Sequence, residues 1–240
     1  MAIVRQTMVY DGPGGPFEGV IAYEDEVETP RPGVLIVPNV LGQKEADNQK
    51  AEELAKLGYV GFACDVFGQG KRAQRGPDMG VHMNACLADR AQLRERLAAS
   101  LQVLKSFGHV DAAKTAAIGF CFGGLCVLDM ARSGQDVLGV VSFHGVYHRP
   151  DYANTVPIGP KVLVCHGWDD PLATPDQTVA LAQELTEGQA DWQLVAYGNT
   201  GHGFTDQSAR ELGIPGVGYQ PDSDRRSWRA MQNFLTELFV

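Results

Sequence analysis

Apolar runs of strand length alternate with amphipathic runs of helix length along most of the chain. An opening hairpin is predicted from strands around residues 8–10 and 19–23, which a segment rich in Gly and Pro joins. Further strands are predicted at residues 34–38, 59–64, 115–118, 137–143, 161–165 and 191–196. Helices are predicted at residues 46–57, 87–107, 125–131, 174–187 and 227–239. This order predicts an α/β fold, in which helices cover both faces of a mainly parallel sheet.

The composition narrows the class of protein. Of the 240 residues, 44% are hydrophobic and 20% are charged, so we expect one soluble domain spanning residues 1–240. The formal net charge of −9 argues against nucleic acid and against an anionic membrane surface as partners. The N-terminal segment lacks the pattern of a signal peptide, and the cytoplasm is therefore the expected location. The five cysteines lack CxxC spacing, which argues against a disulfide framework and against a zinc site.

One short motif, between a predicted strand and a predicted helix, carries most of the chemical information. It reads Gly119-Phe120-Cys121-Phe122-Gly123-Gly124. This is the setting of a nucleophile elbow, written here as G-x-C-x-G. A strained turn of this kind needs glycine at positions 119 and 123, and it lifts the thiol of Cys121 to a helix N-terminus that favours the thiolate. The alternative is a glycine-rich turn around a buried cysteine.

A thiol nucleophile needs a base, and the base needs an acid that orients it. His202 follows the last predicted strand between two glycines, which predicts a loop from which its imidazole points inward. The acid is expected in the turn after the strand at residues 161–165, where Asp170 lies in a G-x-x-D-P pattern. Asp169 lies one residue earlier and remains the alternative acid.

Acyl transfer also needs donors for an oxyanion. The backbone N–H of Phe122 is the first candidate, and the N–H of Val40, after an early strand, is the second. Because ligands of parallel sheets bind beyond the carboxyl ends of the strands, the irregular stretches at residues 67–81 and 205–224 are expected to rim a pocket. Side chains expected to line this pocket are those of Asn39, Gln69, His144, Trp168 and Phe204. For His144 and for His166, which also ends a strand, a satisfied structural role is the favoured alternative.

Taken together, these residues resemble the dienelactone hydrolase family, a branch of the α/β-hydrolase fold with a cysteine nucleophile. The resemblance extends from about Phe17 to Phe239 and is carried by Asp65-Val66-Phe67-Gly68, the elbow motif, Gly167 to Pro171 and His202-Gly203-Phe204-Thr205. It implies that Cys121 is the nucleophile, Asp170 the acid and His202 the base in hydrolysis of a small ester or lactone through an acyl-enzyme. It also implies no metal, no organic cofactor, and a monomer or small homo-oligomer.

Three positions depart from the family pattern. Where well-studied members have a glutamate that helps to ionise the cysteine, this chain has Asn39, which cannot accept the thiol proton. Members that act on dienelactone hold the substrate carboxylate with two arginines. Lys71 and Arg72 lie in the loop that carries the first of these arginines, and an exposed basic loop is the simpler interpretation of them. Asp206 stands in the place of the second arginine. Because Asp206 would repel a carboxylate, a neutral or differently charged ester is favoured over dienelactone.

Two other functions stay open on the sequence alone. A thioesterase or acyl-transfer enzyme would use the same nucleophile, acid and base. A non-catalytic family member with a binding role is the hypothesis that Asn39 favours, because the residue that would ionise the thiol has changed.

Overall fold

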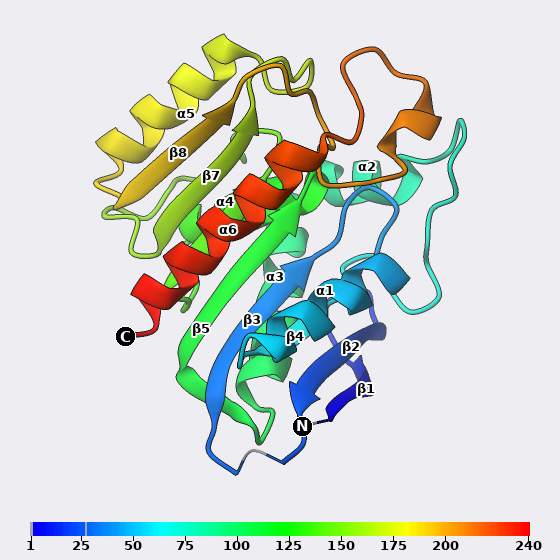
Figure 1. Cartoon of the computed structure of the whole chain (residues 1–240), viewed down its shortest axis with the longest axis vertical. Coiled ribbons are helices and arrows are strands. Elements are labelled where there is room, and N and C mark those ends of the chain that lie inside the picture. The colour runs from blue at the N-terminus through cyan, green and yellow to red at the C-terminus, as the bar shows by residue number, and fades with distance from the viewer. Residues whose placement is uncertain (1, 27) are drawn as a thin grey trace. The chain divides into compact units, whose positions relative to one another are not determined.

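After three opening strands, helices and strands follow one another along the chain in broadly the order that the hydrophobic pattern predicts (Figure 1). The computed structural model describes residues 2–26 and 28–240. They divide into two compact units, residues 1–118 and 119–240, and each unit is described by itself. The expectation of a single domain therefore stays a prediction.

The first unit opens with the predicted antiparallel hairpin, and its strands follow the order β1-β2-β4-β3-β5. Strand β2 pairs antiparallel with β4, which pairs parallel with β3. Helix α1 packs on β2 and β4, while α3 contacts β3 and α2 (Figure 1). The elements of this unit are β1 (Ile3–Tyr10), β2 (Phe17–Glu24), β3 (Arg31–Val37), α1 (Glu45–Lys56), β4 (Val60–Ala63), α2 (Val81–Ala88), α3 (Arg90–Lys105) and β5 (Val110–Phe120), whose last residues belong to the second unit.

The long helix predicted at residues 87–107 is wrong, because the chain forms two helices there. The backbone leaves the helical conformation at Asp89, with φ −137° and ψ 80°. Its carboxylate accepts the N–H of Gln92 at 2.9 Å and so begins α3. The apolar periodicity continues across this break, which is why the pattern alone predicts one helix. Helix α2 begins at Val81, in a region predicted to be irregular up to that residue.

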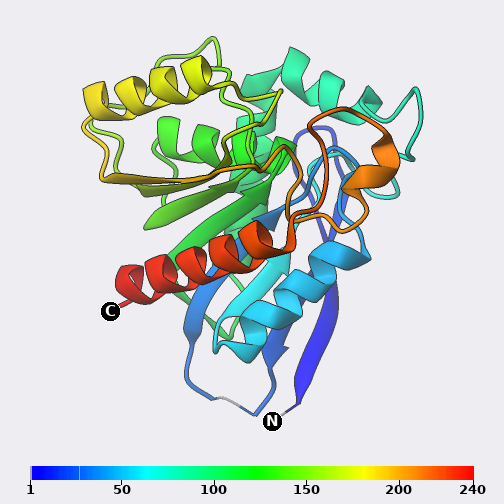
Figure 2. The same ribbon diagram turned by 45° about the horizontal axis from the view of Figure 1, so that its top comes forward.

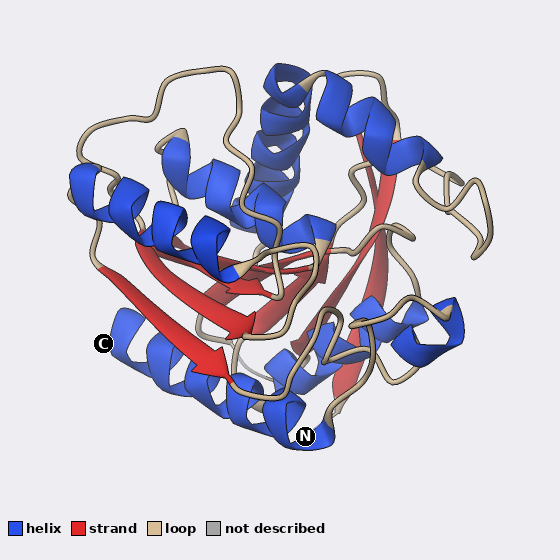
Figure 3. Ribbon diagram, turned by 90° about the horizontal axis from the view of Figure 1, so that it is seen from above, coloured by secondary structure: helices blue, strands red, loops and turns tan. Residues whose placement is uncertain are grey.

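The second unit has three parallel strands, β6, β7 and β8, paired in chain order. Helix α4 contacts β6 and β7, α5 contacts β8, and α6 contacts β6 and β7. Figures 2 and 3 show α5 and α6 on opposite faces of these strands. The elements are α4 (Phe122–Arg132), β6 (Gly139–Phe143), β7 (Lys161–Gly167), α5 (Pro175–Glu187), β8 (Trp192–Tyr197), the short 3-10 helix η1 (Ala209–Leu212) and α6 (Pro221–Leu238).

Helix α6 begins earlier than the predicted start at residue 227. The side-chain oxygen of Gln220 accepts the N–H groups of Asp222 and Ser223, at 2.8 and 3.2 Å. Pro221 then takes the first helical position, where its missing N–H has no cost. The start of α6 is therefore set by capping, which the apolar pattern further along the helix does not reveal.

Helix α4 is buried along its whole length and ends in a buried ionic cluster. The guanidinium of Arg132 donates to both carboxylate oxygens of Glu184 on α5, at 2.9 Å each, and to Asp129 at 3.1 Å. Burial raises the pKa of Glu184, but the bonds to Arg132 outweigh this and lower it below its usual range. The cluster therefore joins α4 to α5 with opposite charges that are held out of water.

Helices that could cross a membrane, by length and by apolar character together, are absent from the described part of the chain.

Candidate active site

Cys121 occupies a strained turn between β5 and α4, as the elbow motif predicts. Its backbone has φ 56° and ψ −114°, a conformation that side chains rarely adopt. A Cβ atom at Gly119 would collide with the carbonyl oxygen of Gly123, so the approach of β5 to α4 requires glycine there. Cys121 is partly exposed, whereas the other four cysteines are buried. Its thiol is therefore the one that a solute reaches most readily.

Asp170 and His202 form a buried pair within the second unit. Asp170 Oδ2 lies 2.8 Å from His202 Nδ1, and Asp170 Oδ1 accepts the N–H of Leu172 at 2.8 Å. Asp169, the alternative acid, is exposed, and its N–H donates to the carbonyl oxygen of Thr200. The turn after β7 thus directs Asp170, and not its neighbour, toward His202.

The second ring nitrogen of His202, Nε2, is buried. Within the described part of the chain, no side chain or backbone group lies in hydrogen-bonding geometry to it. Burial lowers the pKa of His202, but the charge of Cys121 and the bond to Asp170 outweigh burial and raise the pKa to about 10. Since Nδ1 faces a carboxylate, Nε2 is the ring nitrogen that is left for another partner, and a proton exchange between Nε2 and the thiol stays a prediction. The raised pKa favours the imidazolium form of His202.

The backbone on both sides of His202 is fixed by a segment that precedes α6. The N–H of His202 donates to Gly216 at 2.8 Å, and its carbonyl oxygen accepts the N–H of Gly218 at 2.9 Å. Gly203 follows with φ 69°, a left-handed conformation that suits glycine. The stretch predicted as an irregular rim therefore holds the imidazole in place through the backbone.

Two further histidines end strands of this unit, and both are buried and hydrogen-bonded. His144 Nδ1 accepts the N–H of Cys121 at 3.1 Å, and its Nε2 lies 2.8 Å from the hydroxyl of Thr205. His166 bonds the hydroxyls of Tyr147 and Thr178 at 3.0 and 3.1 Å, and burial lowers the pKa of His166. His166 thus has the satisfied environment of a structural residue, whereas His144 touches the elbow.

Trp168 and Phe204, both expected to line the pocket, differ in burial. Trp168 is 45% exposed, and its ring stands edge-on to that of His166 at 6.2 Å. Phe204 is fully buried and packs against the rings of His144 and Tyr197. Phe204 therefore packs against the imidazole of His144, whereas Trp168 has exposed surface that a ligand could contact.

Asn39 and Val40 belong to the first unit, where Asn39 shapes its own loop. The side-chain oxygen of Asn39 accepts the N–H of Leu41 and the ammonium of Lys44, at 3.0 Å each. An amide in this position keeps the turn and carries no charge. The relation of Asn39 and Val40 to Cys121 stays a prediction.

In the first unit, the basic loop that contains Lys71 and Arg72 bonds neighbouring residues of that unit. Arg72 donates to Gln43 at 2.8 Å and lies 3.5 Å from the buried carboxylate of Asp65. Lys71 is exposed, and the exposed Gln69 donates to Glu18 at 2.9 Å. Arg72 therefore has a structural partner in Asp65, the first residue of the Asp65-Val66-Phe67-Gly68 motif. A role for Gln69 in the pocket stays a prediction.

Asp206, at the position of the family's second arginine, is held by the turn that it begins. Its carboxylate accepts the N–H and the hydroxyl of Ser208, at 2.9 and 2.6 Å, just before η1. The side chain is partly exposed. A negative charge is thus fixed four residues after His202, as the sequence indicates.

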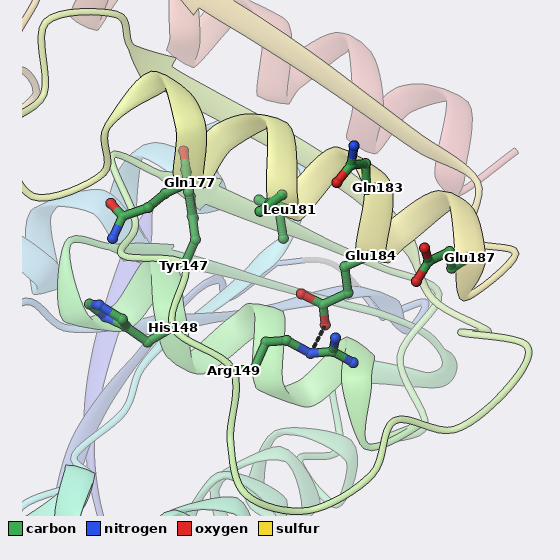
Figure 4. A pocket seen from close by; sticks show the side chains of 9 residues that line it. Tyr147, His148, Arg149, Gln177, Leu181, Gln183, Glu184 and Glu187 are labelled. Atoms are coloured by element: carbon green, nitrogen blue, oxygen red, sulfur yellow. Dashed lines mark ion pairs between the residues drawn. The ribbon is translucent and has the colours of Figure 1, made fainter.

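A cavity of about 290 Å³ lies between α5 and the segment that follows β6 (Figure 4). Tyr147, Gln177 and Glu184 contribute to its wall, and Arg149 pairs with Glu184 at 3.4 Å. The residues that line it include none of the predicted site residues, and no motif in the sequence points to it. Among the residues that the structure describes, no group of three or more His, Cys, Asp or Glu side chains could hold a metal ion.

Residues 17–239 match the model of the dienelactone hydrolase family. The chain belongs to this family. The resemblance noted in the sequence is confirmed, and so is the predicted class of enzyme, a hydrolase acting on ester or lactone bonds. The match covers both units and every candidate residue named above.

Among its relatives, a dienelactone hydrolase-like promiscuous phosphotriesterase from metagenomic libraries is 34% identical, with a TM-score of 0.94 over the whole of both chains. An uncharacterised protein of Caenorhabditis elegans is 35% identical over 154 residues, which cover 62% of this chain and 96% of that protein. A putative carboxymethylenebutenolidase of Yersinia pestis is 23% identical, covering 93% of this chain and 85% of its own length. The likeness to the phosphotriesterase structure and to a structure of a putative dienelactone hydrolase from Klebsiella pneumoniae, 20% identical with a TM-score of 0.81, confirms the α/β-hydrolase fold with a mainly parallel sheet.

Proposed function

We propose that this dienelactone hydrolase family member cleaves small carboxylic esters or lactones through an acyl-enzyme on Cys121, with His202 as base and Asp170 as orienting acid. The observation that carries the proposal is the buried contact of 2.8 Å between Asp170 and His202, beside the thiol that raises the pKa of the imidazole. A thiolate paired with an imidazolium is the activated form of a cysteine nucleophile.

The chemistry takes two steps. The thiolate of Cys121 attacks the carbonyl carbon, a C–S bond forms, and the C–O bond of the ester breaks as the imidazolium of His202 gives its proton to the leaving alkoxide. A water molecule then attacks the thioester while His202 takes a proton from it, the C–S bond breaks, and the carboxylic acid leaves as the thiolate of Cys121 and the imidazolium of His202 are restored. Asp170 keeps the Nδ1 proton of His202 in place throughout, so that Nε2 serves both transfers.

The oxyanion that forms in both steps needs preorganised donors. Phe122 is the first residue of α4 and directly follows Cys121, which is the position that supplies an oxyanion donor in a nucleophile elbow. We assign its N–H as one donor, and each such donor contributes roughly 10²-fold or more to acyl transfer. The N–H of Val40 is the second donor expected from the sequence.

The charge pattern favours neutral substrates. Asp206 lies four residues after His202 and keeps its carboxylate near the surface, and Arg72 is paired with Asp65. A substrate carboxylate would meet repulsion from Asp206. A neutral ester or lactone avoids this cost, which is why dienelactone itself is not proposed.

A second candidate reaction is the hydrolysis of neutral phosphotriesters. The observation that favours it is the likeness, over the whole chain, to a relative described as a promiscuous phosphotriesterase. Thioester cleavage or acyl transfer would use the same three side chains. A binding role without catalysis would instead leave Cys121 with the reactivity of a free thiol, whose pKa is about 8.5.

The test compares Cys121→Ala with Cys126→Ala, which changes a buried cysteine further along α4. We expect Cys121→Ala to lower the rate of nitrophenyl acetate hydrolysis by about 10³-fold or more, since loss of a nucleophile costs orders of magnitude. Cys126→Ala should keep the wild-type rate. Mass spectrometry of the wild type after a short reaction should find the acetyl group on Cys121. Hydrolysis by Cys121→Ala at the wild-type rate would refute the proposal.

A panel of substrates on the wild type separates the remaining functions. Nitrophenyl esters of different chain length, a neutral lactone, acyl-thioesters and diethyl nitrophenyl phosphate are compared by kcat/KM. The highest value for oxygen esters or lactones supports the first candidate, and the highest value for the phosphate supports the second. No turnover of any of them, together with ordinary reactivity of the thiol toward iodoacetamide, would support a binding role.

A further inference from the structure

A second histidine, His144, contacts the backbone of the proposed nucleophile. His144 follows the last residue of β6 and has φ 37°, a left-handed conformation that is uncommon for any residue other than glycine. Its side chain is only 2% exposed. A strained and buried histidine persists only where its surroundings over-determine it, and such residues cluster at functional sites.

The hydrogen bonds of His144 fix its protonation state. The N–H of Cys121 points at Nδ1 of His144 at 3.1 Å and at the carbonyl oxygen of Phe143 at 3.0 Å. A nitrogen that accepts a hydrogen bond carries no proton, so the ring is neutral and its proton is on Nε2. The proton on Nε2 then points at the hydroxyl oxygen of Thr205, 2.8 Å away. Protonation of His144 on both nitrogens would turn the bond to the elbow into a clash of two donors.

Thr205 lies three residues after His202 on the same loop, and the rings of the two histidines are in contact. The ring centroids of His144 and His202 are 5.3 Å apart, with the planes at 69° to each other. Phe204 packs against His144 at 5.0 Å and is fully buried. His144 therefore touches the backbone of the nucleophile, the ring of the base and the loop that carries the base.

We propose that His144 is a positioning residue: as the neutral Nε2–H tautomer it joins the elbow at Cys121 to Thr205, and so fixes the thiol and the imidazole of His202 relative to each other. The inference rests on the proposed function, because it takes Cys121 and His202 as the reacting pair. It adds a path between them, Cys121 N–H to His144 to Thr205, that does not pass through Asp170.

The molecule contains a matched control for this path. His166 is also buried, and its Nε2 lies 3.1 Å from the hydroxyl of Thr178, which is buried as well. The other ring nitrogen of His166, Nδ1, bonds the hydroxyl of Tyr147, so the hydrogen bonds of His166 lead to Tyr147 and Thr178 and away from the elbow. Thr205→Val and Thr178→Val therefore delete the same kind of buried hydroxyl, on the proposed path and off it.

The experiment measures the rate at which iodoacetamide alkylates Cys121 as a function of pH, with the modified cysteine identified by mass spectrometry. Among the titratable groups at this site, Cys121 and Asp170 raise the pKa of His202, and His166 interacts electrostatically with Asp170 and His202. We expect Thr205→Val and His144→Phe to slow alkylation at pH 7 by about tenfold, the size of one lost hydrogen bond, and to move the midpoint of the profile upward, toward about 8.5. Thr205→Ser and Thr178→Val should reproduce the wild-type profile.

His144→Asn refines the test, because asparagine tolerates a positive φ and keeps an acceptor near the position of Nδ1. It should retain more reactivity than His144→Phe. With nitrophenyl acetate, Thr205→Val should lower kcat and leave KM close to the wild-type value. A role in stability alone would lower the melting temperature without moving the pH profile.

Wild-type profiles in Thr205→Val and His144→Phe would overturn the inference, and so would an equal shift in Thr178→Val. If His144→Phe fails to fold, Thr205→Val decides, since it removes one hydroxyl and keeps the shape. The alkylation profile needs no substrate. Absence of ester hydrolysis in the wild type would therefore refute the proposed function alone, and the profiles would still decide on His144.

Discussion

Exchange of Asp170 for asparagine tests the proposed acid at a single atom. Asparagine keeps the size of the side chain and the bond from the N–H of Leu172, which reaches Oδ1 at 2.8 Å. In place of Oδ2, which lies 2.8 Å from His202 Nδ1, it presents an NH₂ group. This group cannot accept the Nδ1 proton, so the imidazole is expected to carry its proton on Nε2. The nitrogen that should take a proton from the thiol is then already occupied.

The size of the loss follows from two parts. A hydrogen bond to a charged group contributes about 1.5–3 kcal/mol, which corresponds to roughly 10- to 150-fold in rate. The reversed tautomer adds to this, because the same exchange in a Ser-His-Asp enzyme lowers kcat by about 10⁴-fold. We therefore expect kcat to fall by about 10²- to 10⁴-fold. KM should change little, since Asp170 is buried and contacts His202 instead of the substrate.

Asp169→Asn provides the control, because it makes the same chemical change one residue earlier on an exposed side chain. Both variants are assayed with nitrophenyl acetate over a range of concentrations, and circular dichroism checks that each is folded. Asp169→Asn should match the wild type. An Asp170→Asn enzyme with wild-type kcat, or a larger loss in Asp169→Asn, would refute the assignment of Asp170.

Two further predictions concern charges that the second unit holds out of water. In an NMR titration, His202 should titrate near the raised pKa of about 10, so its charged form stabilises the folded chain below about pH 6.5 and this stabilisation is lost as pH rises through 10. In Cys121→Ala the pKa should fall, because burial still lowers it and the thiolate is gone; an unchanged pKa would contradict this. Arg132→Leu should lower the free energy of unfolding in urea by about 3–5 kcal/mol, because it removes the buried guanidinium that bonds both Asp129 and Glu184. Arg225→Leu, at an exposed ion pair with Asp222, should leave the midpoint unchanged, and equal losses would contradict the argument.

The sequence predicts those features of the site that depend on a few neighbouring residues. The elbow at Cys121 needs its glycines within two positions, and the loop around His202 needs its own, so both turns are visible as motifs. The spacing in the turn after β7 favours Asp170 over Asp169, but the two differ by one residue. Only the structure brings one of them to the imidazole and leaves the other exposed.

The sequence pattern does not predict contacts between residues that are distant in the chain. His144 and Thr205 are 61 positions apart, and nothing local marks either of them as a partner of the other. The break at Asp89 and the early start of α6 were missed for a related reason, because single capping side chains decide them while the apolar period does not change. The cavity beside Glu184 likewise arises from packing between α5 and the segment after β6.

Cys121 and His144, two of the four non-glycine residues with a positive φ in the described part of the chain, are joined to each other by a hydrogen bond. Each conformation costs about 1–3 kcal/mol, and a folded domain has a total stability of only about 5–15 kcal/mol. The strain at these two residues therefore offsets a noticeable share of the free energy of folding. Selection of variants for heat resistance alone would favour glycine or asparagine at these two positions, and it would remove the reactive site before it changed the rest of the fold.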